Sequence, residues 1–394
     1  MPGYRGVILI IVLKNRVLLT LFVLLLLAAF GLPFLSYAPN RLLSGKSISL
    51  ISLLHGPALW LLLPLLVFAV LSLLTPTRNR ALLTACVAAV LLAMIFWLSG
   101  YTAQQLALQG SPLARTSWSS GCALMAALSG LIAADAMMRI TPSHLWRILG
   151  NVLVLLPAAL LLFTHQLDQL SLLKEYHNRQ EVFDAALLQH LTILLATMVP
   201  ALLIGVPLGV LCFRSTRWQG PIFSTLNIIQ TVPSIALFGL LIAPLAGLAA
   251  ALPWLANLGI SGIGMAPAIV ALVLYALLPL VRSVVAGLQS VPASVIESAS
   301  GMGMTRGQIF FGVQLPLAMP LFLTGVRILA VQTVGMAVVA ALIGAGGFGA
   351  IVFQGLLSSA LDLVLLGVIP VIAMAVIVDS LFKFIISMLE VTAR

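Results

Sequence analysis

The sequence predicts an all-α polytopic membrane protein with about ten transmembrane helices. Of its 394 residues, 62% are hydrophobic and 7% are charged, whereas soluble domains carry roughly 25% charged residues. Only helices and closed barrels satisfy their backbone hydrogen bonds in lipid. The apolar runs are long and continuous rather than alternating, which favours helices over a barrel.

Ten apolar runs approach or exceed the roughly 20 residues that a spanning helix needs. Several exceed that length, which implies tilted or kinked helices. The expected spans lie near residues 17–35, 57–75, 81–99, 119–138, 148–166, 185–212, 220–245, 265–288, 318–345 and 362–388.

The first run has an alternative interpretation as a signal peptide. Basic residues precede it, and Ser36-Tyr37-Ala38 resembles a small-residue cleavage site. However, the run of about 19 residues is longer than the usual apolar region of 7–15 residues, and Pro39 would follow the cut. We therefore expect an uncleaved first span.

The net charge of +10 is distributed as in a membrane protein rather than a nucleic-acid-binding one. With the N-terminus inside, fourteen basic residues fall on the cytoplasmic side and five outside, which is the positive-inside bias. The inner set is Arg5, Lys14, Arg16, Arg78, Arg80, Arg139, Arg147, Arg214, Arg217, Arg282, Arg306, Arg327, Lys383 and Arg394, and the outer set is Arg41, Lys46, Arg115, Lys174 and Arg179. Ten spans also return the C-terminus to the cytoplasm, and the bias is the one expected of an inner membrane protein.

The chain divides into three parts. Residues 1–167 form an N-terminal membrane extension of about five spans, with no obvious chemistry. Residues 168–184 are the most polar stretch, expected outside the membrane with a short amphipathic helix. Residues 185–394 hold five further spans richer in Gly and Pro, including a polar loop at 290–316.

Local signals in this loop predict a helix, a glycine turn and a second helix on the cytoplasmic face. Ser290 is placed to cap the first helix, with Pro292 near its first turn. Gly301 and Gly303 end that helix by permitting positive φ. The alternative is an ordinary loop between spans.

The second helix begins with Thr305, which forms a capping-box pattern with Gln308 three residues later. We expect Glu297 to hold the loop by hydrogen-bonding nearby backbone or Arg groups. A catalytic role is disfavoured, because no base, nucleophile or metal ligand accompanies it.

The same loop resembles the EAA loop of ABC-importer permeases, whose pattern is E-A-A, three residues, Gly, nine residues, I-x-L-P. Val313 stands for Ile, and Ser298 replaces the first Ala. The matching set is Glu297, Ser298, Ala299, Gly303, Leu315 and Pro316. The resemblance implies that this loop receives force from a separate ATPase subunit.

Residues 185–394 resemble the transmembrane domain of type I ABC importers, and within them the permeases for glycine betaine and related osmoprotectants. The motifs are Leu188-Gln-His-Leu191, Gly205-Val-Pro-Leu-Gly209, Ile229-Gln-Thr-Val-Pro-Ser234, Ala341-Leu-Ile-Gly-Ala-Gly-Gly-Phe-Gly349 and Phe353-Gln-Gly-Leu356. The whole chain resembles the longer form with five extra N-terminal spans.

That resemblance implies three kinds of partner. They are an ATPase subunit that binds ATP and Mg, a periplasmic binding protein docking near residues 168–190 and 344–356, and a second permease copy or a paralogous permease. No aromatic cage for a quaternary ammonium is evident, so selection is expected in the binding protein. The chain itself is expected to be a transport subunit without a cofactor.

Four polar residues in the expected seventh span are spaced at i, i+3, i+4 and i+7, which places them on one helix face. They are Asn227, Gln230, Thr231 and Ser234, with Pro233 inside the stripe. Because polar side chains are costly in lipid, the stripe should face protein or a water-filled path. It either lines a translocation path or hydrogen-bonds neighbouring helices.

Gln332 and Thr333, with Tyr275, are further candidates for the same path. Arg282 and Arg327 are expected to extend toward the cytoplasmic interface rather than to contact solute.

The segment Gly344-Ala-Gly-Gly-Phe-Gly349 holds four Gly in six residues and cannot stay helical. Gly344, Gly346, Gly347 and Gly349 therefore form either an outer gate or a plain tight turn. A dinucleotide site is excluded, because no strand precedes the segment.

Asp362 and Asp379 support a rival hypothesis, an ion-coupled secondary transporter, because intramembrane acids are functional candidates. However, Asp379 has Lys383 at i+4, and Asp135 has Arg139 at the same spacing, which is typical of helical ion pairs. A channel and an assembly factor are further alternatives, but neither hypothesis explains the EAA-like spacing.

The sequence disfavours metal, disulfide and nucleotide sites within this chain. Cys86, Cys122 and Cys212 show no CxxC pattern and are expected to pack as small apolar residues. Gly45-Lys46-Ser47 resembles the end of a phosphate loop, but Asn40 stands where the first Gly is required.

Overall fold

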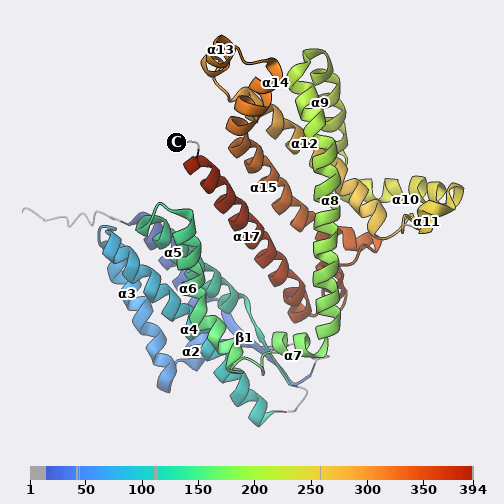
Figure 1. Ribbon diagram of the computed structural model, residues 1–394. Helices are drawn as coiled ribbons and strands as arrows, with labels where there is room; N and C mark the ends of the chain where they lie inside the picture. Colours follow the sequence, from blue (N-terminus) through green and yellow to red (C-terminus); the bar gives the residue numbers. More distant parts are fainter. Residues whose placement is uncertain (1–14, 41–42, 44, 111–113, 258, 393–394) are drawn as a thin grey trace, which may run out of the picture. The chain divides into compact units, whose positions relative to one another are not determined.

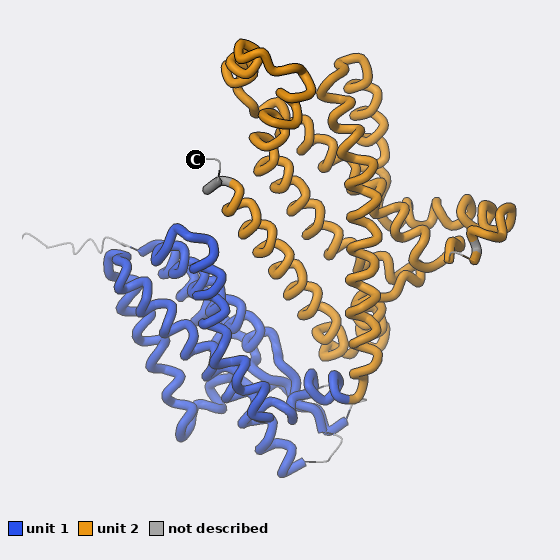
Figure 2. The backbone as a smooth tube through the Cα atoms, in the orientation of Figure 1, with its two compact units in different colours: residues 1–177 blue, residues 178–394 orange. Residues whose placement is uncertain are grey.

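The computed structural model describes residues 15–40, 43, 45–110, 114–257 and 259–392 (Figure 1). The predicted charges Arg5, Lys14, Arg41 and Arg394 lie outside these residues. The chain forms two compact units, which divide between His177 and Asn178 (Figure 2).

Unit 1 is built from apolar helices around one large hydrophobic core, with a smaller apolar cluster beside it. Leu25, Phe68, Ile95 and Met125, each from a different helix, are fully buried in the large core. Its longer helices are α1 (Arg16–Gly31), η1 (Gly56–Leu61) continuing into α3 (Leu62–Leu73), α4 (Arg78–Gln109), α5 (Ser120–Ile140) and α6 (His144–Phe163).

A small antiparallel sheet in unit 1 was not predicted. Its order is β2-β1-β3, with β1 (Pro33–Ala38) between β2 (Lys46–Ser49) and β3 (Arg115–Trp118). The segment that resembles a cleavage site therefore lies in a central strand. The predicted first span of 17–35 is wrong at its end, because α1 stops at Gly31 and the chain turns extended through Pro33.

The predicted short helix in the polar segment is α7 (Ser171–Asn178), and α2 (Leu50–Leu53) is a single turn after β2. Arg115 at the start of β3 pairs with Glu175 of α7, whose side chain is 1% exposed. Lys174 donates to the carbonyl of Ala114 over 3.3 Å. Burial and the neighbouring Arg115 lower the pKa of Lys174. These contacts fasten α7 to the sheet.

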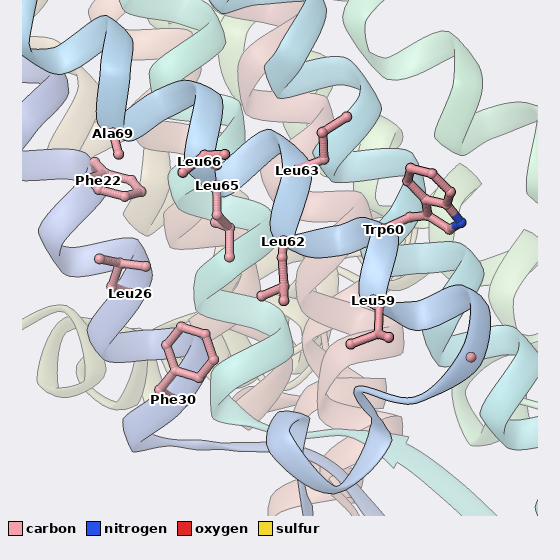
Figure 3. Close-up of a pocket in the computed structure, with 11 residues that line it drawn as sticks. Phe22, Leu26, Phe30, Leu59, Trp60, Leu62, Leu63, Leu65, Leu66 and Ala69 are labelled. Atoms are coloured by element: carbon pink, nitrogen blue, oxygen red, sulfur yellow. The ribbon is translucent and has the colours of Figure 1, made fainter.

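An open apolar groove of about 830 Å³ runs between α1 and the η1–α3 helix of unit 1. Figure 3 shows Phe22, Leu26 and Phe30 of α1 facing Leu62 and Leu65 of α3 across it. No charged side chain lines the groove. It is a surface suited to hydrocarbon, remote in sequence from every predicted site residue.

Unit 2 contains the segments that the sequence links to function. Its elements are α8 (Gln180–Arg214), α9 (Thr216–Thr231), α10 (Ser234–Ala251), α11 (Pro253–Asn257), α12 (Met265–Gln289), α13 (Ala293–Gly301), α14 (Arg306–Ile309), η2 (Phe310–Gln314), α15 (Leu315–Ala340), η3 (Ala341–Ile343), α16 (Phe348–Leu357) and α17 (Leu361–Thr392). Within this unit, α10 and α11 project to one side (Figure 1).

Glycines let α12 pack closely against both α8 and α15. A side chain at Gly205 or Gly209 of α8 would run into Leu280 or Val284 of α12. At Gly325 of α15, an added Cβ would lie 1.8 Å from the hydroxyl of Ser283 in α12. Small residues at such crossings allow the dispersion contacts on which helix association in membranes depends. The three helices therefore form the packed centre of unit 2.

Among the described residues, nine helices are long and apolar enough to cross a membrane, and α1 and α16 are shorter apolar helices. The predicted all-α polytopic class is confirmed. Two of the ten expected spans differ, because α1 has 16 residues and the span expected at 220–245 is two helices. The chain breaks between α9 and α10 at Val232 and Pro233.

Candidate functional site

The first helix of the predicted loop begins later than expected, because it is preceded by Pro292 and not by Ser290. Ser290 ends α12, where its hydroxyl donates to the Gly287 carbonyl over 2.7 Å. The residue that precedes α13 is Pro292, in an extended conformation and without a side-chain cap. The prediction that Ser290 caps the loop helix is therefore wrong, because its hydroxyl is used by the helix before it.

The EAA-like residues lie along α13 in alternating environments. Ala299 is 2% exposed and packs the helix onto the unit, whereas Glu297 and Ser298 are exposed. Ser298 donates to the Ser294 carbonyl over 2.8 Å. Within the described part of the chain, the Glu297 carboxylate has no hydrogen bond or ion pair, which contradicts its predicted role in holding the loop. Its carboxylate is left for contacts outside this chain.

A left-handed residue ends α13. Gly303 has φ +83°, and its N–H donates to the Ser300 carbonyl over 2.9 Å. Nothing lies within 4 Å of an added Cβ there, so the requirement for glycine comes from the backbone and not from space. The predicted glycine turn is confirmed at Gly303. Gly301 is the last helical residue and does not have positive φ.

The predicted capping box is present at the start of α14. The Thr305 N–H donates to Gln308 Oε1 over 2.8 Å, and the Gln308 N–H donates to Thr305 Oγ1 over 3.4 Å. Together these bonds satisfy two amides that would otherwise be unpaired at a helix start.

One turn of π-helix, η2, follows α14 and was not predicted. Its closing bond runs from the Leu315 N–H to the Phe310 carbonyl. Pro316 comes next and has no N–H to give to the carbonyl four residues earlier, so a wider turn here accommodates a missing helical bond. Leu315 and Pro316, the last two EAA-like residues, thus mark where the loop enters α15. From Arg306 to Ile343 the helix is continuous.

The predicted polar stripe does not lie on one helix. Asn227, Gln230 and Thr231 are on α9, while Ser234 begins α10 after the break at Pro233. The spacing was right for a helix, but Pro233 and the extended Val232 end the helix instead of kinking it.

Two stripe residues fasten α9 to α12. Asn227 accepts a hydrogen bond from Arg282 Nη2 over 2.9 Å. Gln230 donates to the Tyr275 carbonyl over 2.9 Å, and the Tyr275 hydroxyl donates to the carbonyl of Val232 at the helix break. These contacts match the interhelical alternative for Asn227 and Gln230. Arg282 contacts α9 rather than only extending toward the interface.

The remaining path candidates bond within their own helices. Thr231 is exposed and donates to the Ile228 carbonyl over 2.7 Å. Thr333 is 3% exposed and donates to the Leu329 carbonyl over 2.9 Å. The exposed Gln332 side chain approaches the Met336 sulfur at 3.6 Å. The structure thus joins Gln230 to Tyr275 by a hydrogen bond. Among the described residues, Thr231, Gln332 and Thr333 make no hydrogen bond to either of these two residues.

The i, i+4 spacing correctly predicted the pairing of Asp379 in unit 2. Asp379 lies 2.6 Å from Lys383 Nζ and 3.7 Å from Arg327 Nε. In unit 1, Asp135 pairs with Arg139 over 2.8 Å. Asp362 occupies the first turn of α17, where a negative charge suits the helix dipole. An acid held by two cations is poorly suited to carrying protons or Na⁺.

The predicted glycine-rich gate is a turn between η3 and α16. Gly344, Gly346 and Gly347 have positive φ, whereas Gly349 lies inside α16 with no room for a side chain, since an added Cβ would be 2.1 Å from the Val338 carbonyl.

The turn is held against α8 by side chains. The Gly347 N–H donates to Gln189 Oε1 over 3.0 Å, and the ring of the fully buried His190 lies against that of Phe348. His190 also bonds through Nε2 to the Val334 carbonyl of α15 over 3.1 Å. Arg179 donates to Gln354 Oε1 of α16 over 3.0 Å. The sequence did not indicate Gln189 and His190 as partners of this turn, although both lie in a motif that carries the resemblance.

Comparison with known proteins matches both halves of the chain. Residues 201–390 match the family described as the binding-protein-dependent transport system inner membrane component. Residues 14–173 match the N-terminal domain of the ABC transporter permease YehY. The second match accounts for the extra N-terminal spans that the sequence predicted.

The curated relatives align with about half of this chain. The carnitine transport permease protein OpuCB of Listeria monocytogenes is 37% identical over 48% of this chain and 80% of its own length. The osmoprotectant import permease protein OsmW of Salmonella typhimurium is 37% identical over 49% of this chain and 85% of its own length. The choline transport system permease protein OpuBB of Bacillus subtilis is 36% identical over 48% and 81%.

A solved structure, the inward-facing MetNI methionine ABC transporter, covers 54% of this chain and 98% of its own at 22% identity, with a TM-score of 0.48. The family match and the curated relatives are sufficient for assignment without it. The chain belongs to the family of inner membrane components of binding-protein-dependent transport systems, the permease subunits of ABC importers, and its role is transport, with the ATPase in a separate subunit.

Proposed function

We propose that this chain carries a small osmoprotectant, glycine betaine or a related quaternary ammonium compound, across a bacterial inner membrane. Support comes from relatives named for carnitine, choline and osmoprotectant transport, and from the motifs along α8, α9 and the glycine-rich turn. Such a cation binds best in a cage of aromatic rings, which the sequence does not suggest here. A periplasmic binding protein therefore selects the solute.

The observation that carries the transport mechanism is the exposed helix α13. Glu297 and Ser298 face away from the unit, Ala299 anchors the helix, and Gly303 fixes the turn after it. The segment then runs through Leu315 and Pro316 into α15. In our proposal the partner ATPase, with ATP and Mg bound to it, pushes on α13, and the continuous helix carries that push into the membrane.

The orientation follows from the charge distribution. The positive-inside bias of fourteen basic residues against five supports a cytoplasmic location for α13, the N-terminus and the C-terminus. An ATPase that binds nucleotide in the cytoplasm then meets α13 directly. The outer end of unit 2 holds the glycine-rich turn, where the binding protein docks near the start of α8 and residues 344–356, with Gly344, Gly346, Gly347 and Gly349 as the outer gate.

Exposed polar residues in membrane helices support pairing with a second permease, either another copy or a paralogue. Asn227 and Thr231 on α9 and Gln332 on α15 are exposed in this chain, and lipid is a costly environment for them. A partner permease across a water-filled path removes that cost. The same path is supported by four less exposed residues, Gln230, Ser234, Tyr275 and Thr333.

The test is ATP hydrolysis by the complex of this chain with its ATPase and binding protein in nanodiscs. We compare the binding protein empty, loaded with glycine betaine, and loaded with carnitine or choline. Wild type should be stimulated by a loaded binding protein. Gly303→Val should assemble but lose that stimulation, because a β-branched residue is strained at φ +83°.

Gly301→Ala is the matched control, since Gly301 is helical and has open space around it. It should behave as wild type. Stimulation by another solute alone would correct the substrate and leave the mechanism standing. An ATPase that does not bind the chain, or does not respond to any loaded binding protein, would overturn the proposed function.

A further inference from the structure

The π-turn η2 places one aromatic side chain at the junction of four helices. Phe310 is 7% exposed and packs in a cluster with Val284 and Leu288 of α12. Ile296 of α13 packs against the same cluster, as do Val206 and other apolar side chains of α8 and Phe322 of α15. Phe310, the first residue after the capping-box helix, thus belongs to one apolar cluster that also includes side chains of the exposed loop and of the membrane helices.

Arg214, the last residue of α8, lies over this ring. Its guanidinium carbon is 4.6 Å from the centre of the Phe310 ring, within the range of a cation–π interaction. In the described part of the chain, Arg214 has no acidic partner, so its positive charge is satisfied by the face of the Phe310 ring. The interaction links the end of α8 to the start of the helix that follows α13.

The helix that begins at Arg306 is longer than the membrane is thick, so the Arg214–Phe310 contact lies near its end outside the hydrocarbon. The continuous helix from Arg306 to Ile343 has 38 residues, about 57 Å at 1.5 Å per residue, whereas the hydrocarbon core is about 30 Å thick. The helix therefore extends beyond the hydrocarbon, and Phe310 lies in its first two turns, where α13 joins it. A wider π-turn at this point allows the end of the helix to shift relative to the part in lipid.

We propose that Arg214 and Phe310 are positioning residues that transmit movement of α13 to α8, through the cation–π contact at the π-turn. This inference rests on the proposed function, because it requires an ATPase acting on α13. Without the contact, α13 and α14 move with the ATPase while α8 is not carried along, so ATP is hydrolysed with less solute moved.

A purely structural role predicts a different result. Arg214 also lies in the last turn of α8, where any cation favours the helix dipole. If that were its whole contribution, removing the Phe310 ring would leave it intact, and the effects of the two substitutions would be independent. A double-mutant cycle separates the two cases.

The experiment uses the complete complex in nanodiscs and measures ATP hydrolysis and glycine betaine uptake together. Arg214→Gln and Phe310→Leu should each lower solute moved per ATP about two- to fivefold, the size expected from losing a contact of this kind. The double variant should be no worse than the poorer single one. Arg214→Lys and Phe310→Tyr, which keep the cation and the ring, should restore most of the ratio.

Arg217→Gln is the matched control, because Arg217 is an exposed cation three residues further on and lies in α9. It should leave the ratio unchanged. Multiplicative losses in the double variant, or a wild-type ratio in both single variants, would overturn the proposal.

A second readout does not depend on the solute. Spin labels at Leu203→Cys on α8 and Leu240→Cys on α10, both more than 60% exposed, report movement of α8 in a Cys86→Ser background. Cys122 and Cys212 are buried and stay unlabelled. With ATPase and ATP–vanadate, the distance should change in wild type and Arg217→Gln, and the fraction of molecules that shows the change should be smaller in Arg214→Gln and Phe310→Leu.

The uptake and distance measurements together distinguish a failure of the positioning role from a failure of the proposed function. A wild-type distance change without stimulation by glycine betaine would correct the proposed solute and leave the role of Arg214 testable by distance alone. A distance change as large and as frequent in Arg214→Gln and Phe310→Leu as in wild type would refute the positioning role while the importer function stands.

Discussion

Two glycine turns bound the same long helix, and they differ in what surrounds them. Gly303 precedes the helix with φ +83° and nothing within 4 Å of an added Cβ. Gly346 follows it with φ +78°, and an added Cβ would meet the Gln189 amide at 2.1–2.4 Å. Both need glycine for the backbone, but only the second is also packed against another helix.

The difference indicates which end of the helix moves freely. The Gly303 turn is exposed and held by its own backbone bonds, so the turn itself can change its conformation without disturbing side-chain packing. The Gly346 turn is bonded to α8 through Gln189, so it moves only together with α8. Movement of the long helix started at the Gly303 end would therefore reach the Gly346 turn together with α8, to which that turn is bonded.

The largest effect is expected for Gly346→Val. Its positive φ alone costs about 1–3 kcal/mol, and the displaced Gln189 amide leaves the Gly347 N–H unpaired, which costs about 1–3 kcal/mol more. The thermal unfolding midpoint of the purified chain should fall clearly. Gly335→Val, at a helical glycine with open space, should leave the midpoint close to that of wild type. Equal midpoints for the two variants would refute the packed-turn description.

A smaller loss of stability is expected for Gly303→Val. Here only the backbone cost of about 1–3 kcal/mol applies, and the exposed loop can unfold locally without opening the core. The unfolding midpoint should fall less than for Gly346→Val, although stimulated ATP hydrolysis is lost. A midpoint as low as that of Gly346→Val would mean that the Gly303 turn is also part of the packed structure.

The clash at the packed turn should depend on its partner. Gly346→Ala should cost about 1 kcal/mol more in wild type than in a Gln189→Ala background, because the shorter side chain makes room for the new methyl group. A cycle of unfolding free energies measures the difference. Additive costs would show that Gln189 does not limit the space at residue 346.

The smallest effect is expected for Thr305→Ala, which removes the capping box. The cost is about 1 kcal/mol, and it should appear as faster hydrogen exchange at the amides of Arg306–Gln308. Thr305→Ser keeps the hydroxyl and should exchange as wild type does. Unchanged exchange in Thr305→Ala would show that the cap does not stabilise α14.

The elements that the sequence predicted well depend on local chemistry. Gly303 and the Thr305–Gln308 pair each act within a few residues, so their types and spacing were sufficient to place the turn and the cap. The long apolar runs located most membrane helices for the same reason. Ser290 was misplaced because a serine between two helices can serve either one, and the Gly287 carbonyl took its hydroxyl.

The elements that the sequence missed depend on distant partners. The break between α9 and α10 is stabilised by the hydrogen bond from Tyr275 to Val232, which is 43 residues away along the chain. The contact of Gln189 with Gly347 joins residues 158 positions apart. The π-turn depends on how α15 packs after Pro316. None of these partners is evident from a single local window.

The small sheet of unit 1 sets an order for folding during synthesis. The hairpin of β1 and β2 closes locally, but the other edge of β1 pairs with β3 at residues 115–118. At 5–20 residues per second, about 80 further residues take roughly 4–16 s to emerge. During that time an unpaired strand edge is exposed next to newly inserted helices, so unit 1 passes through an aggregation-prone stage.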